Sequence, residues 1–288
     1  MALQGDTLWI GSLNGLYTYQ LNTKKLASLD SKSNGLPHHT IYSIIRTTDN
    51  QIYVGTYNGL CRYIEESGKF ENIPLPVNRS VSNLFVNSLL EDTSRQCIWI
   101  GMEGSLFQYT PATGLMKPID AFHNNSIKSL ALDGDGNLLA GTDNGLYVYQ
   151  NDNGTLQHIV HDSRNIQSLT NNIIWNIFAD QEQNIWLGTD YGISLSRYNS
   201  ALQFIPISQI TGTGDGNQFY SLFRDSKGFY WFGGTNGVIR FTNPTGNKHD
   251  AVWYRMGDKH HPLSHNRIRH IYEDREQQLW IATDGSIN

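Results

Sequence analysis

The sequence has few cysteines, no long apolar run and no excess of charge of one sign. Its two cysteines, Cys61 and Cys97, are too few for a disulfide framework. The 21 basic residues are interspersed with 26 acidic ones, for a net charge of -5. They form neither a basic stripe for nucleic acid nor a polybasic segment for a membrane surface. The composition therefore argues against a nucleic-acid partner and against direct membrane contact.

The sequence also lacks the marks of secretion, membrane insertion and long helices. Residues 1–5 have neither the basic nor the apolar region of a signal peptide, and no window approaches the apolar length of a membrane span. No stretch has the periodicity of a long amphipathic helix. What is abundant is glycine (27), tyrosine (15) and tryptophan (7), a composition typical of many short strands joined by turns. We therefore predict an all-β chain.

A repeated unit accounts for most of this composition. Its clearest copy, Asn172 to Ile193, contains an apolar run, a polar turn, a tryptophan-containing triplet closed by glycine, and a second turn. The closing glycine recurs as Gly11, Gly55, Gly101, Gly141, Gly188 and Gly233, with Ala282 in the seventh copy. One position of the triplet holds five of the seven tryptophans: Trp9, Trp99, Trp186, Trp231 and Trp280. A period of 40 to 49 residues indicates propeller blades or a similar array.

Three positions of the repeat have expected structural roles. The closing glycine permits close approach of the next sheet. The threonine or serine after it (Ser12, Thr56, Thr142, Thr189 and Thr283) is expected to satisfy a local backbone group. The aspartates Asp180, Asp225 and Asp274 recur with the repeat, which favours a turn role over acid–base chemistry.

The predicted fold is a β-propeller of four-stranded antiparallel blades, six to seven in number, with seven favoured and the terminal blades incomplete. A single such sheet cannot hide its tryptophans from water, whereas stacked sheets can. The expected blades form one domain over residues 1–288 and lie at about 8–30, 41–76, 84–120, 127–160, 173–208, 217–255 and, in part, 266–288. The first copy has no evident sequence for its inner strand, so the strand near Ile268 either completes that blade or begins a seventh. A parallel β-helix is the alternative fold.

These residues resemble the two-component regulator propeller repeats of bacterial hybrid sensor histidine kinases. The matching pieces are Asn172 to Gly192, Asn217 to Gly237, Asn266 to Gly285, and the opening Leu8-Trp9-Ile10-Gly11 with Gly15-Leu16. The linking loops match as well, at Asn34 to Pro37, Ser168 to Asn172 and Pro262 to Asn266. The resemblance covers nearly the whole chain.

The resemblance implies a sensory role outside the inner membrane. In that family, two seven-bladed propellers and a β-sandwich form a periplasmic region that senses a glycan-derived ligand and signals to a histidine kinase and so to transcription. This chain would then be a portion of that region. Its partners would be an oligosaccharide or other small ligand, the second propeller and β-sandwich of the parent chain, and a second copy of the receptor in a homodimer.

No catalytic or cofactor-binding constellation stands out. The ten histidines include His38 and His39 but show no His-Glu-x-x-His spacing, and no Cys-x-x-Cys occurs. The segment Asp133 to Asn137 is similar to the start of a calcium loop, but Asn144 stands where such a loop ends in glutamate. Thr211 to Gly216 is rich in glycine but is not followed by Lys-Ser/Thr, so it is a connection and not a phosphate loop. We expect no catalytic residues, no metal and no cofactor.

Candidate ligand-binding residues come from the repeat position that varies most. It follows the first apolar residue of the inner strand and holds Tyr42, Asn87, Lys128, Trp175, Tyr220 and Arg269, to which the preceding loops add His39 and Arg267. Aromatic faces beside amide and guanidinium donors would suit an uncharged or acidic oligosaccharide. The alternative is that the aromatic members only pack between blades.

Three functions remain open. The first is a non-enzymatic sensing module that shifts the arrangement of a larger receptor. The second is a lyase or hydrolase built on a propeller, and the third is a protein-docking scaffold with a broad exposed apolar patch.

Overall fold

The structure is a computed structural model of the chain. It describes residues 1–29, 33–76, 84–122, 125–150, 153–198, 204–206, 217–243 and 250–288. These residues divide into two compact units, residues Met1–Leu130 (unit 1) and Ala131–Asn288 (unit 2), which are taken separately below. The predicted connection at Thr211 to Gly216 lies outside the described residues.

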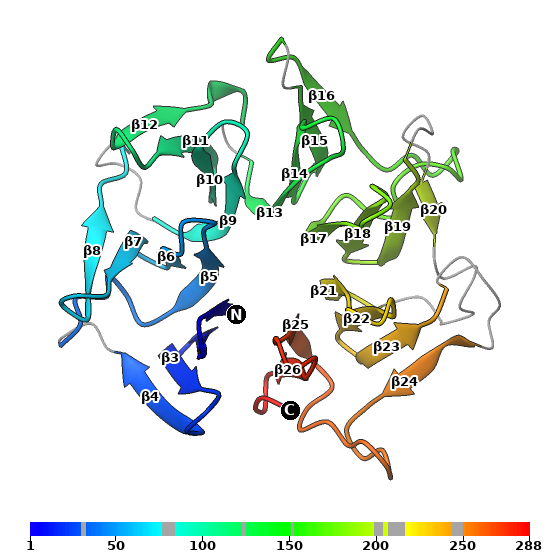
Figure 1. The fold of residues 1–288 in the computed structure, drawn as a ribbon. Coiled ribbons are helices and arrows are strands. Elements are labelled where there is room, and N and C mark those ends of the chain that lie inside the picture. The colour runs from blue at the N-terminus through cyan, green and yellow to red at the C-terminus, as the bar shows by residue number, and fades with distance from the viewer. Residues whose placement is uncertain are drawn as a thin grey trace. The chain divides into compact units, whose positions relative to one another are not determined.

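Unit 1 contains three antiparallel sheets of four strands, each ordered as in the sequence (Figure 1). The first sheet consists of β1 (Ala2–Gln4), β2 (Thr7–Ser12), β3 (Gly15–Gln20) and β4 (Lys25–Leu29). The second consists of β5 (Ile41–Arg46), β6 (Ile52–Thr56), β7 (Gly59–Ile64) and β8 (Lys69–Ile73). The third consists of β9 (Val86–Asp92), β10 (Cys97–Met102), β11 (Ser105–Thr110) and β12 (Leu115–Pro118), and the short 3-10 helix η1 (Asp120–Phe122) follows it.

The chain continues with three more four-stranded sheets and one pair of strands. β13 (Ile127–Leu132) spans the division between the units and pairs in order with β14 (Leu138–Thr142), β15 (Gly145–Tyr149) and β16 (Leu156–Ile159). The next sheets are β17 (Ile174–Ala179), β18 (Ile185–Thr189), β19 (Gly192–Ser196) and β20 (Phe204–Pro206), then β21 (Phe219–Arg224), β22 (Tyr230–Gly234), β23 (Gly237–Phe241) and β24 (Val252–Tyr254). β25 (Ile268–Glu273) and β26 (Leu279–Thr283) form the two-stranded sheet.

Four-stranded antiparallel sheets that follow one another along the chain are the blades of a β-propeller, so the predicted fold class is confirmed. The described residues contain six four-stranded blades and, in β25 and β26, two strands of a seventh. All ladders between these strands are antiparallel, which excludes the parallel β-helix.

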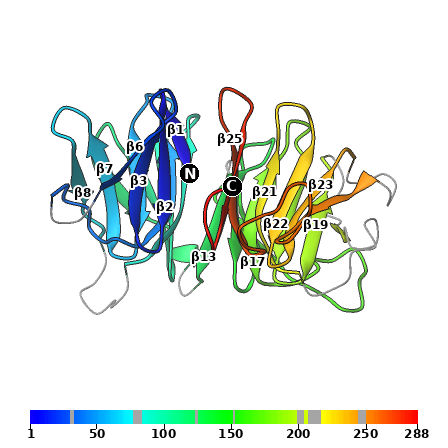
Figure 2. The same ribbon diagram turned by 90° about the horizontal axis from the view of Figure 1, so that it is seen from below.

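The expectation that the first blade lacks an inner strand is wrong. β1 pairs with β2 through Ala2 and Trp9, Leu3 and Leu8, and Gln4 and Thr7, and Figure 2 shows β1 beside β2. This strand has three residues and turns directly into β2 through Gly5, whose φ is 56°. The other copies have strands of six or seven residues and longer turns at this place, so the short strand escaped the repeat pattern. The strand at Ile268 pairs with β26 and is not needed to complete the first blade.

The closing glycine permits the close approach predicted for it. A Cβ on Gly11 would lie 2.5 Å from Ile41 Cγ2 on the next blade, and one on Gly233 would lie 2.5 Å from Ile268 Cγ2. Gly141 faces Ile174 in the same way at 2.6 Å. No real Cβ sits so close to another carbon, so any larger residue would push neighbouring blades apart.

The recurring aspartates hold the turn that joins the first and second strands of a blade, as predicted. Asp180 Oδ1 accepts a hydrogen bond from Asn184 N at 2.8 Å, and Asp225 Oδ1 accepts one from Phe229 N at 2.8 Å. The second carboxylate oxygen also accepts from the tryptophan of the repeat, a bond the sequence did not reveal. The pairs are Trp99–Asp92 at 3.0 Å, and Trp186–Asp180, Trp231–Asp225 and Trp280–Asp274 at 2.8 Å. We call this the Asp–Trp end of a blade.

Four tryptophans of the repeat, Trp9, Trp99, Trp186 and Trp231, are buried, whereas Trp280 is half-buried. Trp186 is 1% exposed and packs with Phe219, Leu222 and Phe232 of the following blade. Trp9 packs in the same manner against Ile41 and Ile52. Burial of a side chain of this size stabilises the fold by roughly 3 kcal/mol. Cys61 and Cys97 are buried free thiols.

Candidate functional site

The variable repeat position coincides with a β-bulge. The pairing of β5 with β6 skips from Ile41 to Ser43, so Tyr42 is the extra residue. The same shift leaves Trp175, Tyr220 and Arg269 out of the ladders of β17, β21 and β25, and Asn87 out of the ladder of β9. A bulge frees one residue from pairing and re-aims its side chain. We call this the bulge end of a blade, opposite its Asp–Trp end.

The bulge end also contains the turn between the second and third strands. Thr56 and Thr189 fix this turn, because each hydroxyl donates to the carbonyl of the glycine three residues later at 2.9 Å. Ser12 and Thr142 donate in the same way to Gly15 and Gly145, and Thr283 donates to the carbonyl of Ser286, so each satisfies a local backbone group as predicted. The residue after the threonine is thereby presented beside the bulge residue.

In unit 1 the bulge end carries a histidine–aromatic cluster made of His38, His39, Tyr42, Tyr57 and Phe85. The two imidazole rings stack with centroids 4.2 Å apart, and the His38 ring lies 4.8 Å from the Tyr57 ring. The rings of Tyr57 and Phe85 are 4.1 Å apart, and Tyr42 follows at 6.0 Å from Phe85. Tyr42 is 42% exposed and Tyr57 is 40% exposed, so the cluster offers ring surface to solvent.

Two groups of this cluster have shifted pKa values. Burial, together with Tyr57 and Glu103, raises the pKa of Tyr42, so its hydroxyl stays protonated. Burial, together with the charge of His39, lowers the pKa of His38. His38 Nδ1 accepts a hydrogen bond from Thr40 N at 3.0 Å, which requires that nitrogen to be unprotonated. The lowered pKa of His38 and the raised pKa of Tyr42 both favour the neutral forms of these two rings.

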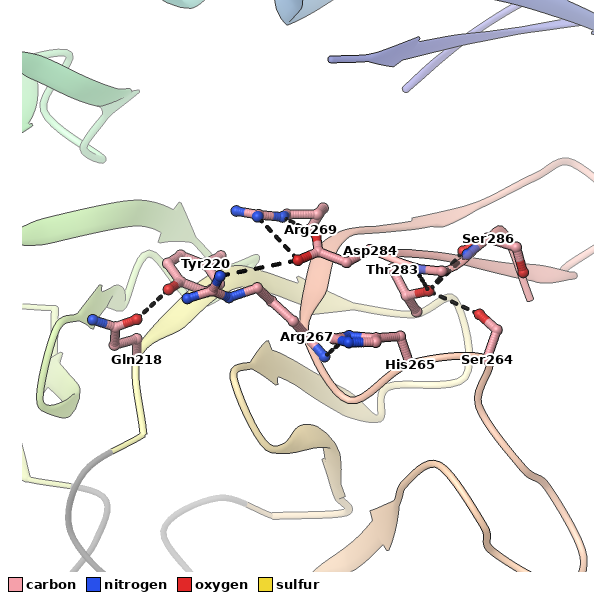
Figure 3. A network of polar contacts seen from close by, with 10 residues as sticks. Gln218, Tyr220, Ser264, His265, Arg267, Arg269, Thr283, Asp284 and Ser286 are labelled. Carbon is pink, nitrogen blue, oxygen red and sulfur yellow. Dashed lines mark hydrogen bonds and ion pairs between the residues drawn. The ribbon is translucent and has the colours of Figure 1, made fainter. Parts of the chain in front are cut away.

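In unit 2 the bulge end carries an arginine–aromatic cluster made of Trp175, Tyr220, Arg267, Arg269 and Asp284. Figure 3 shows Tyr220, Arg267, Arg269 and Asp284 of this cluster. The rings of Trp175 and Tyr220 meet edge to face, with centroids 5.4 Å apart. The guanidinium carbons of Arg267 and Arg269 lie 5.9 Å and 5.7 Å from the centre of the Tyr220 ring. Three successive blades thus contribute to one cluster.

Two aspartates from the turns position these side chains. Asp190 Oδ1 accepts hydrogen bonds from Trp175 Nε1 at 3.0 Å and from Gln218 Nε2 at 2.5 Å. The Tyr220 hydroxyl in turn donates to Gln218 (Figure 3). Asp284 accepts from Arg269 Nε at 2.5 Å and from Arg269 Nη2 at 3.2 Å, with both carboxylate oxygens engaged.

The structure brings the predicted residues together in part. Tyr42 and His39 share the first cluster, and Trp175, Tyr220, Arg267 and Arg269 share the second. Asn87 and Lys128 lie half-buried on β9 and β13, and the contacts that define the two clusters do not include them. Trp175 packs against Tyr220 of the next blade, and Tyr42 lies 6.0 Å from Phe85 at the start of the next blade while 42% of it stays exposed.

Sequence reasoning missed the residues of the second turn. Tyr57, Asp190 and Asp284 all stand two positions after the closing residue of the triplet, so one repeat position carries them. This position varies between copies as strongly as the bulge position. Comparing the copies at both positions would have found these residues.

The described residues contain no group of three or more histidine, cysteine, aspartate or glutamate side chains that could hold a metal ion. At the segment similar to a calcium loop, Asp133 Oδ1 accepts from Asp135 N at 3.0 Å and from Asn137 N at 2.8 Å, which is the turn role of the other aspartates. Within the described part of the chain, no helix has the length and apolarity to cross a membrane.

Antiparallel four-stranded blades of this register define a β-propeller, and several of its bulge residues lie in the two clusters described above. The two component regulator propeller family matches residues 35–58, 168–191, 213–236 and 262–285, which are four copies of the repeat. The chain belongs to this propeller repeat family.

Relatives with known names agree with this assignment. The chain is similar to the extracellular domain of BT4673 from B. thetaiotaomicron, whose crystal structure shares 83% sequence identity over 100% of this chain and 39% of that chain, with a TM-score of 0.68. It is also 30% identical over 269 residues to histidine kinase P4 of Formosa agariphila, covering 82% of this chain and 18% of the relative. The chain thus spans well under half the length of both relatives.

A distant structure supports the fold alone. PorZ of Porphyromonas gingivalis has a TM-score of 0.74 at 15% identity, with 100% of this chain and 45% of that chain covered.

Proposed function

We propose that the chain is the ligand-sensing propeller portion of an extracytoplasmic region in a hybrid two-component sensor histidine kinase, and that it responds to a glycan-derived oligosaccharide. The observation that supports ligand sensing is that exposed aromatic and guanidinium side chains lie together at or beside the bulge residues Tyr42 and Arg269. Extracytoplasmic placement is supported by the extracellular domain of BT4673, which is assigned to a hybrid two component system.

The chemistry of the two clusters fits a saccharide. Aromatic faces pack against the C–H faces of sugar rings, and amide or guanidinium donors bind sugar hydroxyls. Tyr42 and Tyr57 offer the first kind of surface, and Arg267 and Arg269 offer the second. The proposed set of ligand-binding residues is completed by Trp175, Tyr220, Asn87, Lys128 and His39.

The rest of the receptor is proposed from the resemblance to hybrid sensor kinases. We propose that residues 1–288 form one propeller domain. Its first blade begins with β1 at Ala2 and extends to about residue 30, and the others lie at about 41–76, 84–120, 127–160, 173–208, 217–255 and 266–288. We propose that a second propeller and a β-sandwich complete the periplasmic sensor, that the parent receptor is a homodimer, and that ligand binding reaches transcription through the kinase. A ligand produces such a signal only through different affinities for two receptor states.

The test is a panel of polysaccharide fragments, read as a shift in melting temperature and confirmed by calorimetric titration. A binding fragment is expected to raise the melting temperature and to lose affinity in Tyr42→Ala. The matched control is Tyr198→Ala, because Tyr198 is 43% exposed, close to the 42% of Tyr42, and lies in neither cluster. If no fragment binds, or if both variants lose affinity equally, ligand sensing at this end is wrong.

A further inference from the structure

The arginine–aromatic cluster carries more positive charge than its own aspartate balances. Arg267 and Arg269 converge on the single carboxylate of Asp284, and both guanidinium groups face the Tyr220 ring. Arg269 makes two hydrogen bonds to Asp284, whereas Arg267 reaches it only at 4.0 Å. Among the described residues, the Arg267 guanidinium has no hydrogen-bonding partner, so its five donors remain available.

These groups are accessible and held in place. The side chains of Arg267 and Arg269 are 42% and 45% exposed, and that of Asp284 is 32% exposed. Arg269 is the extra residue of a bulge, and the backbone N–H of Asp284 donates to the Arg267 carbonyl at 3.0 Å. The backbone therefore fixes the three side chains beside one another while their charged ends meet solvent.

We propose that this cluster binds the carboxylate of an acidic oligosaccharide, a chain that contains uronic acid. The proposal rests on the proposed function and names the ligand class of the same site. A planar guanidinium fork pairs with a carboxylate through two parallel hydrogen bonds, and an aromatic ring beside it packs against the sugar that carries the acid. Tyr220 supplies that ring, and Trp175 supports it from the preceding blade.

Asp284 makes the contacts with Arg269 that the carboxylate of the proposed ligand would make. Its two oxygens occupy Arg269 as an incoming carboxylate would, so the ligand competes with Asp284 for the arginines. Because of this competition, substitutions of the arginines and of Asp284 should change the affinity for the acid in opposite directions. Neutralising the arginines weakens acid binding, and neutralising Asp284 strengthens it.

The test is calorimetric titration of the full chain with oligogalacturonate and oligoglucuronate trisaccharides. Each is compared with its carboxyl-reduced form, which differs only in charge and hydrogen-bonding capacity. We expect the acidic form to bind at least about tenfold more tightly, because each charge-assisted hydrogen bond is worth roughly a tenfold to hundredfold change in affinity. The preference should shrink as salt is raised.

Variants test whether the arginine–aromatic cluster causes the preference for the acidic trisaccharide. R267Q/R269Q is expected to lose about a hundredfold in affinity for the acidic trisaccharide, and D284N to gain a few-fold. Arg164→Gln is the matched control, because Arg164 pairs with Asp162 in the same unit and lies outside the cluster; it should leave affinity unchanged. D284N and the reduced sugars keep the test valid if the double variant fails to fold.

The outcomes separate the two proposals. If reduced and acidic sugars bind equally, if a sulfated sugar binds more tightly than the uronate, or if D284N weakens binding, the acidic-ligand proposal is overturned while glycan sensing stands. If neither acidic nor neutral oligosaccharides bind the wild-type chain, glycan sensing itself is overturned.

Discussion

The two ends of a blade differ in how far their residues are repeated from blade to blade. At the Asp–Trp end, the same carboxylate, turn and indole recur in four blades with hydrogen bonds of 2.8 to 3.0 Å. At the bulge end, the equivalent positions hold tyrosine, asparagine, lysine, tryptophan and arginine. The Asp–Trp end is repeated because each blade has to bury its large side chains between neighbouring sheets. The bulge end varies because the side chain of the bulge residue takes no part in that packing. The Asp–Trp end thus stabilises the fold, and the opposite end of the same strand is the one for which we propose recognition.

The largest expected effect contrasts two tryptophans of one blade. Both Trp186 and Trp175 donate an indole N–H to an aspartate, but Trp186 is 1% exposed at the Asp–Trp end and Trp175 is half-buried at the bulge end. Trp186→Ala should lower the free energy of unfolding by about 3–5 kcal/mol, and Trp175→Ala by about 1 kcal/mol, in urea titrations. Equal losses would show that the two ends do not differ in this way.

The next contrast concerns two aspartates, Asp180 and Asp190, that each accept a hydrogen bond from an indole N–H. Asp180 also accepts from Asn184 and from the buried Tyr230 hydroxyl at 3.2 Å, so Asp180→Asn would place an amide donor against other donors. We expect a loss of about 2–3 kcal/mol in the free energy of unfolding for Asp180→Asn and under about 1 kcal/mol for Asp190→Asn. Thermal unfolding of the two variants measures the difference. The reverse order would contradict the assignment of stability to the Asp–Trp end.

A third contrast uses pH. Burial alone would raise the pKa of Asp92, but hydrogen bonds from Ser94, Trp99 and Arg95 outweigh it, so the pKa of Asp92 lies below its usual value. A carboxyl group with a lowered pKa stabilises the fold above its unfolded pKa of about 3.9 and loses that contribution as pH falls through its folded pKa. Acidification from pH 6 to pH 3 should therefore destabilise the wild type more than Asp92→Asn. If the free energy of unfolding falls in parallel with pH for the wild type and for Asp92→Asn, Asp92 makes no pH-dependent contribution to stability.

The smallest expected effect is an exchange at the bulge end. Tyr42→Lys places in the second blade the residue that the fourth blade has at Lys128. Because Tyr42 is exposed and unpaired, the free energy of unfolding should change by less than about 0.5 kcal/mol. Chemical denaturation checks this. A loss above about 2 kcal/mol would mean that the bulge residue is part of the fold.

The repeated end could be predicted from the sequence and the variable end only in part. Glycine, aspartate and tryptophan recur at fixed spacing, so their close approach, turn and burial follow from the pattern. The bond between indole and carboxylate did not, because six or seven residues separate the partners and the turn geometry decides whether they meet. The short strand Ala2–Gln4 was missed because three residues carry no periodicity.

At the bulge end, the sequence indicated the position but not the neighbours. Tyr42, Trp175, Tyr220 and Arg269 were found because copies differ there. Their partners Tyr57, Asp190 and Asp284 lie in the turn between the second and third strands of a blade. Only the antiparallel register places that turn beside the bulge. The pairing of Arg269 with Asp284 spans 15 residues and depends on that register.

An unpaired residue at the start of a strand costs the blade one ladder position and leaves the rest of its pairing intact. The blades that contain β5, β9, β17, β21 and β25 therefore each have a residue whose side chain can be replaced without a change in the strand pairing. A propeller of such blades can change its binding specificity by one substitution at a time, in any order. The strand pairing of its blades stays the same.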